Sequence, residues 1–250
     1  MTKEFTLNSK TAIVTGGGKG IGRVIALGLA KAGANVVVCS RTLPDLEGTS
    51  QEIEKMGRDS LAIVADVTKK EDIENLVVKT KERFGSIDVL VNNAATSYLR
   101  PLMKLREEGW DSIFDTNLKA VFLLSREAAK VMMEQNGGRI INITTVGAEK
   151  PEAGMGAYSA SKAGLKMLTK SMALEWGRYN INVNAVGPGL TKTEFSKPLW
   201  SNPDMLKKIS GGIPLGRIAE PGDIVGAVVF LASDAASYIT SQSIYVSGGA

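Results

Sequence analysis

The sequence predicts a single α/β domain, a doubly wound parallel sheet of about seven strands with helices on both faces. The first observation is the alternation of short β-branched runs with longer helical patterns, which continues almost to the C-terminus. The second is that the strands are continuous apolar runs, such as Ile140-Ile-Asn-Ile143, as double-sided burial requires. The third is size, because 250 residues with 44% hydrophobic content suit one domain with a sizeable core. We find no linker-like segment that would divide the chain.

Each element has its own local signal. β-branched and apolar runs predict strands over residues 11–15, 35–39, 60–65, 88–92, 139–145, 181–186 and 242–246. Helical patterns cover residues near 20–32, 45–56, 69–84, 107–135, 157–179 and 221–232. Thr68-Lys-Lys-Glu71 has the form of a capping box, and Gly33, Gly57 and Gly85 stand where three helices should end.

The composition excludes several classes of function. The chain has no histidine and one cysteine, Cys39, so His-based triads and Cys/His metal sites are excluded. The 30 basic and 26 acidic residues are interspersed, and no basic run indicates a nucleic-acid partner. The N-terminus lacks the apolar core of a signal peptide, and no stretch approaches the ~18 apolar residues of a membrane span. We therefore expect a cytoplasmic protein with no membrane partner and with Cys39 buried in a strand.

A glycine-rich segment, Thr15-Gly-Gly-Gly-Lys-Gly-Ile-Gly22, follows the first predicted strand and opens the first helix. Glycines let the backbone approach a pyrophosphate, and the helix N-terminus supplies N–H donors and partial positive charge. The strict G-x-G-x-x-G pattern does not fit, because Ile21 stands where the third glycine would fall. The pattern present is Gly16-xxx-Gly20-x-Gly22, and its position predicts a Rossmann-type dinucleotide site.

The end of the second strand predicts which dinucleotide binds. An Asp or Glu is expected there when the adenosine ribose carries a free 2′-hydroxyl, but this chain has Ser40 and Arg41. Lys19 in the glycine loop can converge on the same place. Two cations and a hydroxyl suit a ribose 2′-phosphate, so we predict NADP(H) in preference to NAD(H). The alternative is that Lys19 and Arg41 are ordinary exposed charges.

In a chain without histidine, Tyr158 and Lys162 are the most informative pair. Four residues apart on a helix, they share one face. An ammonium about 4 Å from a phenol, at an effective dielectric constant of ~20, would lower the pKa of the phenol by up to about 3 units. Such a tyrosine can donate or accept a proton near neutral pH.

Together these features resemble the short-chain dehydrogenase/reductase superfamily, in its single-domain branch, over essentially the whole chain. The motifs that carry the resemblance are Thr15-Gly-xxx-Gly-Ile-Gly22, Asp66-Val67, Asn92-Asn-Ala-Ala95, Asn117, Tyr158-xxx-Lys162, Pro188-Gly189 and Val246-Ser-Gly-Gly249.

The resemblance implies an oxidoreductase that interconverts a ketone and a secondary alcohol by hydride transfer. Tyr158 would be the general acid or base, and Lys162 would lower its pKa and bind the nicotinamide ribose. Asn117 would hold a water that links Lys162 to solvent. The family usually has serine at the position of Thr145, whose hydroxyl can still donate to a substrate oxygen although its methyl group narrows the pocket.

The resemblance also assigns cofactor contacts along the sheet edge. Asp66 and Val67 would contact the adenine, Asn93 and Ala94 the adenine ribose, and Pro188–Thr193 the nicotinamide carboxamide. The predicted cofactor set is Gly16, Gly18, Lys19, Gly20, Ile21, Gly22, Ser40, Arg41, Asp66, Val67, Asn93, Ala94, Tyr158, Lys162, Pro188, Gly189, Thr191 and Thr193. Thr15 and Asn92 more simply tie strands together.

Residues 194–217 interrupt the alternation and are expected to form a substrate lid. Its apolar residues are Phe195, Leu199, Trp200, Met205, Leu206 and Ile209. The opposite wall is assigned to Tyr98, Leu99, Glu149 and Met155. This character favours an apolar or alicyclic ketone or secondary alcohol, with sugars and acyl thioesters left open.

The mode of assembly and three alternative functions stay open. The resemblance implies a homodimer through the helices at 107–135 and 157–179, and commonly a homotetramer. One alternative function is a catalytically impaired NADP-binding scaffold or sensor, since Thr145 replaces serine. Others are a 3-oxoacyl thioester reductase, or a nucleotide-sugar epimerase or dehydratase of the extended relatives, which share Tyr-xxx-Lys.

Overall fold

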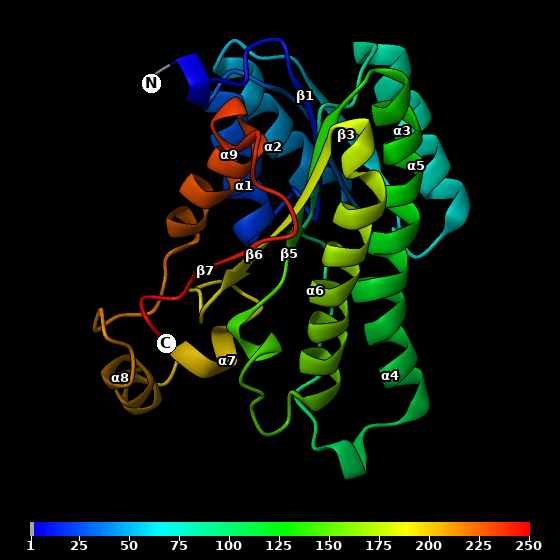
Figure 1. Ribbon diagram of the computed structural model, residues 1–250. Helices are drawn as coiled ribbons and strands as arrows, with labels where there is room; N and C mark the ends of the chain where they lie inside the picture. The colour runs from blue at the N-terminus through cyan, green and yellow to red at the C-terminus, as the bar shows by residue number, and fades with distance from the viewer. Residues whose placement is uncertain (1–2) are drawn as a thin grey trace.

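A parallel sheet with helices on both faces forms the centre of the computed structural model, which describes residues 3–250 (Figure 1). Within these residues the sheet has seven strands in the order β3-β2-β1-β4-β5-β6-β7, and each neighbouring pair is parallel. The strands are β1 (Thr11–Thr15), β2 (Asn35–Ser40), β3 (Ser60–Val64), β4 (Val89–Asn92), β5 (Gly138–Ile143), β6 (Ile181–Pro188) and β7 (Ser243–Val246). The predicted fold class is confirmed, with strand boundaries that differ by at most two residues.

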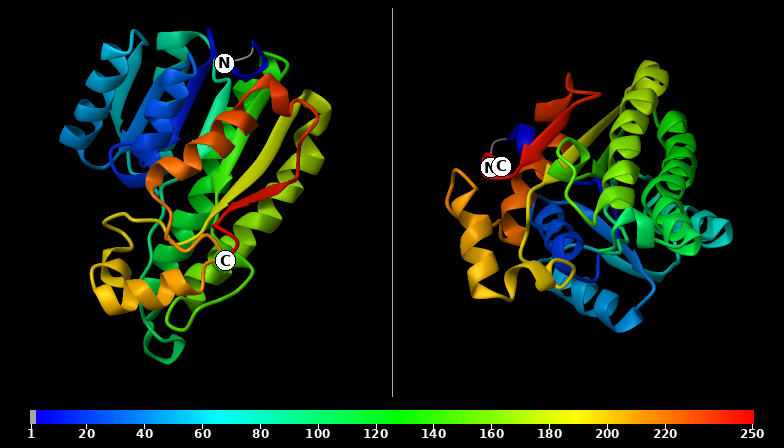
Figure 2. Two further views of the ribbon diagram at one scale, coloured as in Figure 1. Left: turned by 90° about the vertical axis from the view of Figure 1, so that its left-hand side faces the viewer. Right: turned by 90° about the horizontal axis from the view of Figure 1, so that it is seen from below.

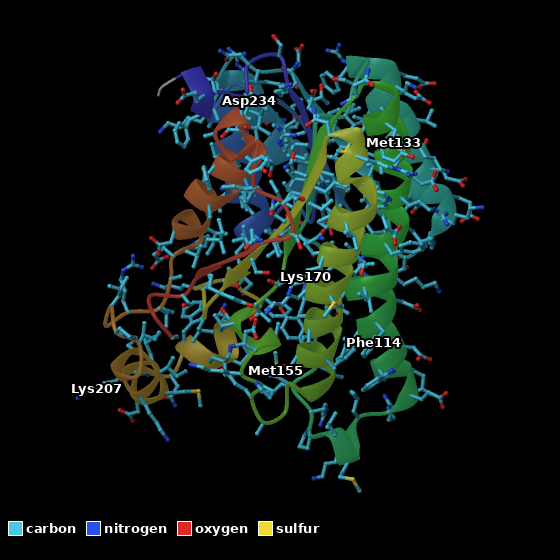
Figure 3. The ribbon with its side chains drawn as sticks, in the orientation of Figure 1. Phe114, Met133, Met155, Lys170, Lys207 and Asp234 are labelled. Carbon is cyan, nitrogen blue, oxygen red and sulfur yellow. The ribbon has the colours of Figure 1, made fainter. Side chains whose placement is uncertain are left out.

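The helices divide between the two faces of the sheet, as Figures 1 and 2 show. α1, α2 and α9 bury their apolar sides in one core, and α3, α5 and α6 bury theirs in the other. Their side chains fill the space between helices and sheet (Figure 3). The helices are α1 (Gly20–Lys31), α2 (Leu43–Lys55), α3 (Lys70–Phe84), α4 (Glu107–Phe114), α5 (Ala120–Glu134), α6 (Gly156–Trp176), α7 (Lys197–Trp200), α8 (Pro203–Gly211) and α9 (Val225–Ala232).

The predicted helix-ending glycines are confirmed, but one predicted helix cap is not. Gly33, Gly57 and Gly85 all have positive φ just beyond helices, as predicted. The predicted capping box at Thr68 is wrong, because α3 begins at Lys70 and its N-cap is Lys69. The Thr68 N–H and hydroxyl instead donate to Asp66 Oδ1, at 3.0 and 2.7 Å. Thr68 therefore stabilises the turn after β3 rather than the helix.

The strand order changes direction between β1 and β4. After β1 the chain continues to β2 on one side, and after β4 it continues to β5 on the other side. Ligands of doubly wound folds bind at such a switch point, outside the carboxyl ends of the strands. Thr15 and Asn92 hold this region together, as predicted. Thr15 Oγ1 donates to the Val91 carbonyl, and Asn92 Nδ2 donates to Ser125 and Asn142.

Two expectations from composition can be compared with the structure. Cys39 is buried in β2, as predicted, and burial raises the pKa of its thiol to about 12. Among residues 3–250, no helix is long and apolar enough to cross a bilayer, and no cluster of side chains could hold a metal ion.

Candidate active site

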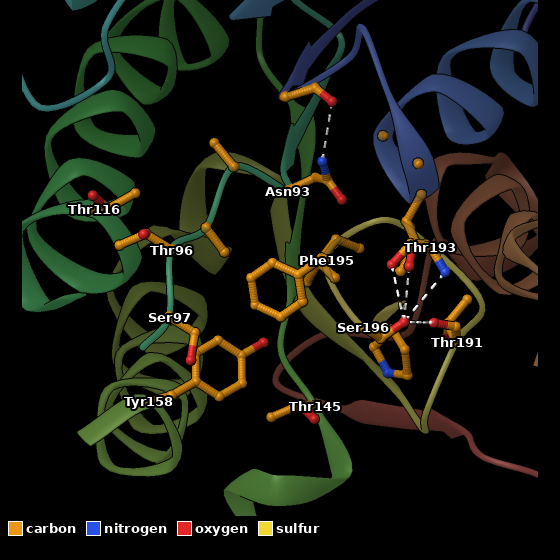
Figure 4. Close-up of a pocket in the computed structure, with 18 of the residues that line it drawn as sticks. Asn93, Thr96, Ser97, Thr116, Thr145, Tyr158, Thr191, Thr193, Phe195 and Ser196 are labelled. Carbon is orange, nitrogen blue, oxygen red and sulfur yellow. Dashed lines mark hydrogen bonds between the residues drawn. The ribbon is translucent and has the colours of Figure 1, made fainter. Parts of the chain in front are cut away.

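A cavity of about 1150 Å³ lies along the carboxyl edge of the sheet, large enough for a dinucleotide and a small substrate. Figure 4 shows its catalytic end. Its lining includes every predicted cofactor residue, which are Gly16, Gly18, Lys19, Gly20, Ile21, Gly22, Ser40, Arg41, Asp66, Val67, Asn93, Ala94, Tyr158, Lys162, Pro188, Gly189, Thr191 and Thr193. Segments far apart in sequence thus meet in one cavity, because all of them follow carboxyl ends of parallel strands.

The glycine loop is packed too closely for side chains. A Cβ on Gly22 would lie 2.2 Å from the Gly16 carbonyl oxygen, and Gly16 has a φ of +65°. Asn93 fixes the loop from the neighbouring strand, since its Nδ2 donates to the Thr15 carbonyl at 2.9 Å. α1 carries no acidic residue in its first turn, so its N-terminus stays electropositive. This cradle fits the pyrophosphate of a dinucleotide.

A carboxylate that the prediction did not consider pairs with Lys19 beside the adenosine end of the cavity. Lys19 Nζ lies 2.9 Å from Asp45 Oδ2 in the first turn of α2. The prediction concerned the end of β2, where no acid stands, and it did not consider Asp45 in α2. Asp45 stands five residues beyond the end of β2, and the packing of Gly18 against its backbone brings it to Lys19.

Arg41 and Asp66 face each other at the same end. Burial acts to raise the pKa of Asp66, but hydrogen bonds from Thr68 and the positive charges of Arg41 and Lys69 hold it below its usual value. Asp66 is therefore ionised at neutral pH. Arg41 is exposed and forms no ion pair within 4.0 Å in the described part of the chain, so its guanidinium is available to a ligand.

α6 carries Tyr158 and Lys162 one turn apart, as the spacing predicts. The Tyr158 hydroxyl points into the cavity, on the side of Thr145 and Phe195 (Figure 4). The Lys162 side chain is 2% exposed, and its Nζ donates to the Ile143 carbonyl at the end of β5 at 2.7 Å. Nζ lies 5.9 Å from the centroid of the Tyr158 ring.

The pKa values in the free protein differ from the sequence-based expectation. Burial raises the pKa of Tyr158 to about 12 and lowers the pKa of Lys162 to about 7. The expected lowering of the phenol pKa by an adjacent ammonium is therefore wrong for the free protein. Burial disfavours the charged form of both groups, and the amine that was to compensate is directed at a backbone carbonyl.

Thr145 follows β5 and faces the same cavity. Its Oγ1 accepts a hydrogen bond from the Gly147 N–H at 3.2 Å, which caps the turn Val146–Ala148. The hydroxyl proton thus remains available to the cavity. Thr144 turns to the neighbouring strand, where its hydroxyl donates to Val186 O at 3.2 Å.

Asn117 does not line the cavity; it is fully buried in the π-helical turn Asp115–Lys119 between α4 and α5. Its amide pairs with the backbone of Thr96 in both directions, at 2.9 and 3.0 Å, and donates to Ser161 Oγ at 3.0 Å. The side chain thus holds the cavity-lining loop at Thr96 against α6, beside Lys162. Its water-holding role stays a prediction.

The base of the predicted lid is tied down by a hydroxyl cluster (Figure 4). Ser196 donates to the Thr191 carbonyl and accepts from the Thr193 N–H at 3.2 Å. This turn places Phe195 6.0 Å from Tyr158, measured between ring centroids. Of the six apolar lid residues named in the prediction, Phe195 and Leu199 line the cavity, whereas Trp200 and those of α8 do not.

The opposite wall of the cavity differs from the prediction in one residue. Tyr98, Leu99 and Met155 line the cavity as predicted, but Glu149 does not. Glu149 instead pairs with Lys166 and accepts a hydrogen bond from Tyr245. Glu152, three residues further along the chain, lines the cavity in its place. Both glutamates lie in an irregular segment, where neither strand nor helix periodicity predicts which side chain faces the cavity.

Comparison with known proteins gives the family. The family model described as enoyl-(acyl carrier protein) reductase matches residues 16–250. The 3-oxoacyl-acyl-carrier-protein reductase FabG of Staphylococcus epidermidis is 41% identical over 242 residues, which are 96% of this chain and 98% of the relative. Dehydrogenase/reductase SDR family member 4 of Oryctolagus cuniculus is 39% identical and covers 100% of this chain and 96% of its own.

Solved structures agree with these relatives. A gluconate 5-dehydrogenase from Burkholderia cenocepacia, in complex with NADP and tartrate, superposes with a TM-score of 0.95 at 32% identity, over 98% of this chain and 96% of its own. A 7α-hydroxysteroid dehydrogenase, in complex with NADH and a 7-oxo bile acid conjugate, superposes with a TM-score of 0.96 at 33% identity, over 100% and 97%. The glycine cradle, the Tyr158–Lys162 helix and these similarities together show that the chain belongs to the short-chain dehydrogenase/reductase superfamily of oxidoreductases.

Proposed function

We propose that the protein is an NADP(H)-dependent oxidoreductase that interconverts a ketone and a secondary alcohol, with Tyr158 as general acid and base. The observation that carries this proposal is the meeting of the Tyr158 hydroxyl, Thr145 and the glycine cradle in one cavity. NADPH, when bound, supplies the hydride. The chain supplies the proton, the hydrogen bonds that orient the carbonyl, and shelter from water.

Each catalytic side chain has a separate task. Tyr158 donates its proton to the carbonyl oxygen, and the Thr145 hydroxyl donates a hydrogen bond to the same oxygen as negative charge develops. Lys162, whose Nζ donates to the Ile143 carbonyl, is placed to hydrogen-bond the cofactor ribose. Asn117 positions the loop at Thr96.

Ketone reduction is the direction that we propose to test first. Burial raises the pKa of Tyr158 to about 12 in the free protein, so its hydroxyl carries the proton that carbonyl reduction requires. The test is a panel of ketones graded by size and polarity, with NADPH consumption followed by absorbance. Cofactor binding without turnover of any ketone would favour the alternative of an NADP-binding scaffold.

A 3-oxoacyl thioester is the second candidate substrate, because a 3-oxoacyl reductase is among the relatives. A thioester would enter past Phe195 and Leu199 at the cavity mouth. A 3-oxoacyl thioester in the panel distinguishes it from small alicyclic ketones. The preferred class is the one with the higher kcat/KM.

The preference for NADPH is assigned to Arg41 and Lys19, because both line the adenosine end of the cavity. We expect Arg41→Ala to weaken NADPH binding roughly tenfold while NADH binding changes little, since a charge-assisted hydrogen bond contributes about 1.5–3 kcal/mol. Titration of both cofactors by fluorescence measures this. Equal losses for NADPH and NADH would contradict the assignment.

Asp45→Asn is the matched variant, for which we expect the opposite change in NADPH affinity. It removes the carboxylate that neutralises Lys19 and leaves the side-chain size unchanged. We expect tighter NADPH binding and unchanged NADH binding. The pair of variants therefore separates the 2′-phosphate contact from general damage to the site.

Thr145 is expected to tolerate serine but not the loss of its hydroxyl. Thr145→Val keeps the shape and removes one donor to the developing oxyanion, so kcat should fall roughly 10²-fold. Thr145→Ser should retain kcat within a few-fold, because the hydroxyl and the cap on Gly147 persist. An unchanged kcat in Thr145→Val would show that Thr145 has no catalytic role. Thermal unfolding of both variants controls for the lost cap.

We also propose a homodimer or homotetramer assembled through α4, α5 and α6. Exposed apolar side chains on these helices, including Trp110, Phe122 and Met167, support it. The cytoplasm remains the proposed location.

A further inference from the structure

The charges in the substrate half of the cavity indicate which substrates it accepts. This half is bounded by residues 96–99, 145–155 and 194–199. It is lined by hydroxyl groups, by apolar side chains and by two carboxylates, Glu152 and Glu194. In the described part of the chain, its sole cation is Lys162, whose amine is buried and bonded to a backbone carbonyl.

The two carboxylates are not equivalent. Glu194 is largely exposed and pairs with Lys197, whose Nζ lies 3.1 and 3.2 Å from its two oxygens. Glu152 is exposed at the cavity and forms no ion pair within 4.0 Å among residues 3–250. Glu152 therefore places an uncompensated negative charge in this half of the cavity.

Nearby cations do not cancel this charge. The Arg100 N–H donates to the Gly154 carbonyl at 2.9 Å, which ties the two cavity walls together. However, the guanidinium of Arg100 and the amine of Lys150 do not line the cavity. Lys166, which lies on α6, is already paired with Glu149.

The remaining lining is apolar and accessible. Tyr98 is 45% exposed, Leu99 is 60% exposed and Phe195 is 55% exposed. Phe195 lies over the catalytic tyrosine, with ring centroids 6.0 Å apart. These side chains offer contact area to an uncharged hydrocarbon body next to the reacting carbonyl.

We infer that the substrate is an uncharged ketone or alcohol with an apolar body, and that Glu152 selects against substrates that carry a carboxylate. The inference rests on the proposed function, since it concerns the same cavity. An unpaired charge that repels the wrong ligand is a source of specificity. Because Glu152 is exposed, solvent and salt partly screen this repulsion.

The test uses two substrates that differ only in charge. One is cyclohexanone with a carboxylate across the ring from the carbonyl, and the other is the matching carboxamide. In the wild-type protein we expect kcat/KM for the carboxamide to exceed that for the carboxylate about fivefold, since two like charges about 4 Å apart in water repel by about 1 kcal/mol. In Glu152→Gln we expect this ratio to fall to about twofold, because kcat/KM for the carboxylate rises. The difference between the wild-type and Glu152→Gln ratios should shrink as the salt concentration is raised.

Glu175→Gln is the control, because Glu175 is another exposed glutamate without an ion pair among the described residues, near the far end of α6. It changes the net charge equally and should leave the wild-type ratio intact. A wild-type ratio near one, or a Glu152→Gln ratio equal to that of wild type, would overturn the inference.

A binding measurement separates this inference from the proposed function. Calorimetry with NADPH-loaded Tyr158→Phe protein gives the Kd of each ligand without turnover. Weaker binding of the carboxylate that is relieved by Glu152→Gln supports the inference even if no ketone is reduced. Equal Kd values contradict it even if turnover is fast.

Discussion

Tyr158→Phe is expected to lower kcat for ketone reduction roughly 10³-fold while NADPH binds with unchanged affinity. The variant keeps the ring that contacts Phe195 and removes the hydroxyl to which we assign proton donation. The cofactor cradle is formed by backbone of the glycine loop and does not depend on this hydroxyl. Loss of turnover with intact binding therefore isolates proton donation.

Steady-state kinetics and a cofactor titration on the same preparation measure this. Tyr238→Phe is the matched control, because Tyr238 is fully exposed and lies outside the cavity. A Tyr158→Phe protein that keeps more than about a tenth of wild-type kcat would show that another group supplies the proton.

Lys162→Met is expected to remove activity and, at the same time, to stabilise the free protein. Activity should fall roughly 10²-fold, because the amine that would hydrogen-bond and orient the nicotinamide ribose is lost. The stability gain arises because burial lowers the pKa of Lys162 to about 7, so the folded state disfavours the charged amine. The hydrogen bond to Ile143 is also lost, which offsets about 1.5–3 kcal/mol of this gain because the donor is charged near pH 6. We expect Tm near pH 6 to rise by roughly 4 °C or more.

The lowered pKa of Lys162 determines how the stability gain of Lys162→Met depends on pH. Below about pH 7 the amine is protonated both folded and unfolded, so the full destabilisation is present. Between about pH 7 and the ordinary lysine pKa of ~10.4, the unfolded chain binds a proton that the folded protein does not, and wild-type stability rises with pH. The advantage of Lys162→Met should therefore be largest near pH 6 and shrink toward pH ~10.

Lys170→Met provides the comparison, because Lys170 is an exposed lysine on the same helix (Figure 3). It should change neither activity nor the pH dependence of Tm. A Tm difference between Lys162→Met and wild type that stays constant from pH ~6 to ~10 would contradict the lowered pKa.

Much of the architecture follows from local signals. β-branched runs such as Asn35–Ser40 predict buried parallel strands, and a helix that follows a glycine loop predicts the cradle. Four-residue spacing places Tyr158 and Lys162 on one helix face without knowledge of the rest of the chain. These features depend on residues close in sequence, so the sequence is sufficient to place them.

The sequence is insufficient where a contact depends on packing. Asp45 reaches Lys19 because α2 packs against the glycine loop, which no local pattern indicates. Glu152 rather than Glu149 lines the cavity, because Glu149 forms an ion pair with Lys166 on α6. The pKa values of Tyr158 and Lys162 likewise follow from burial, whereas the sequence-based argument considered their mutual attraction alone.

The most direct test of the proposed chemistry is the fate of a deuterium label on the nicotinamide ring. Two NADPH samples, each deuterated on one of the two faces of the reactive carbon, are incubated with the best ketone of the panel, and the alcohol is analysed by mass spectrometry. We predict that one sample delivers one deuterium to the carbinol carbon and the other delivers none, since the cavity holds the cofactor in one orientation. Alcohol without deuterium from either sample would contradict direct hydride transfer.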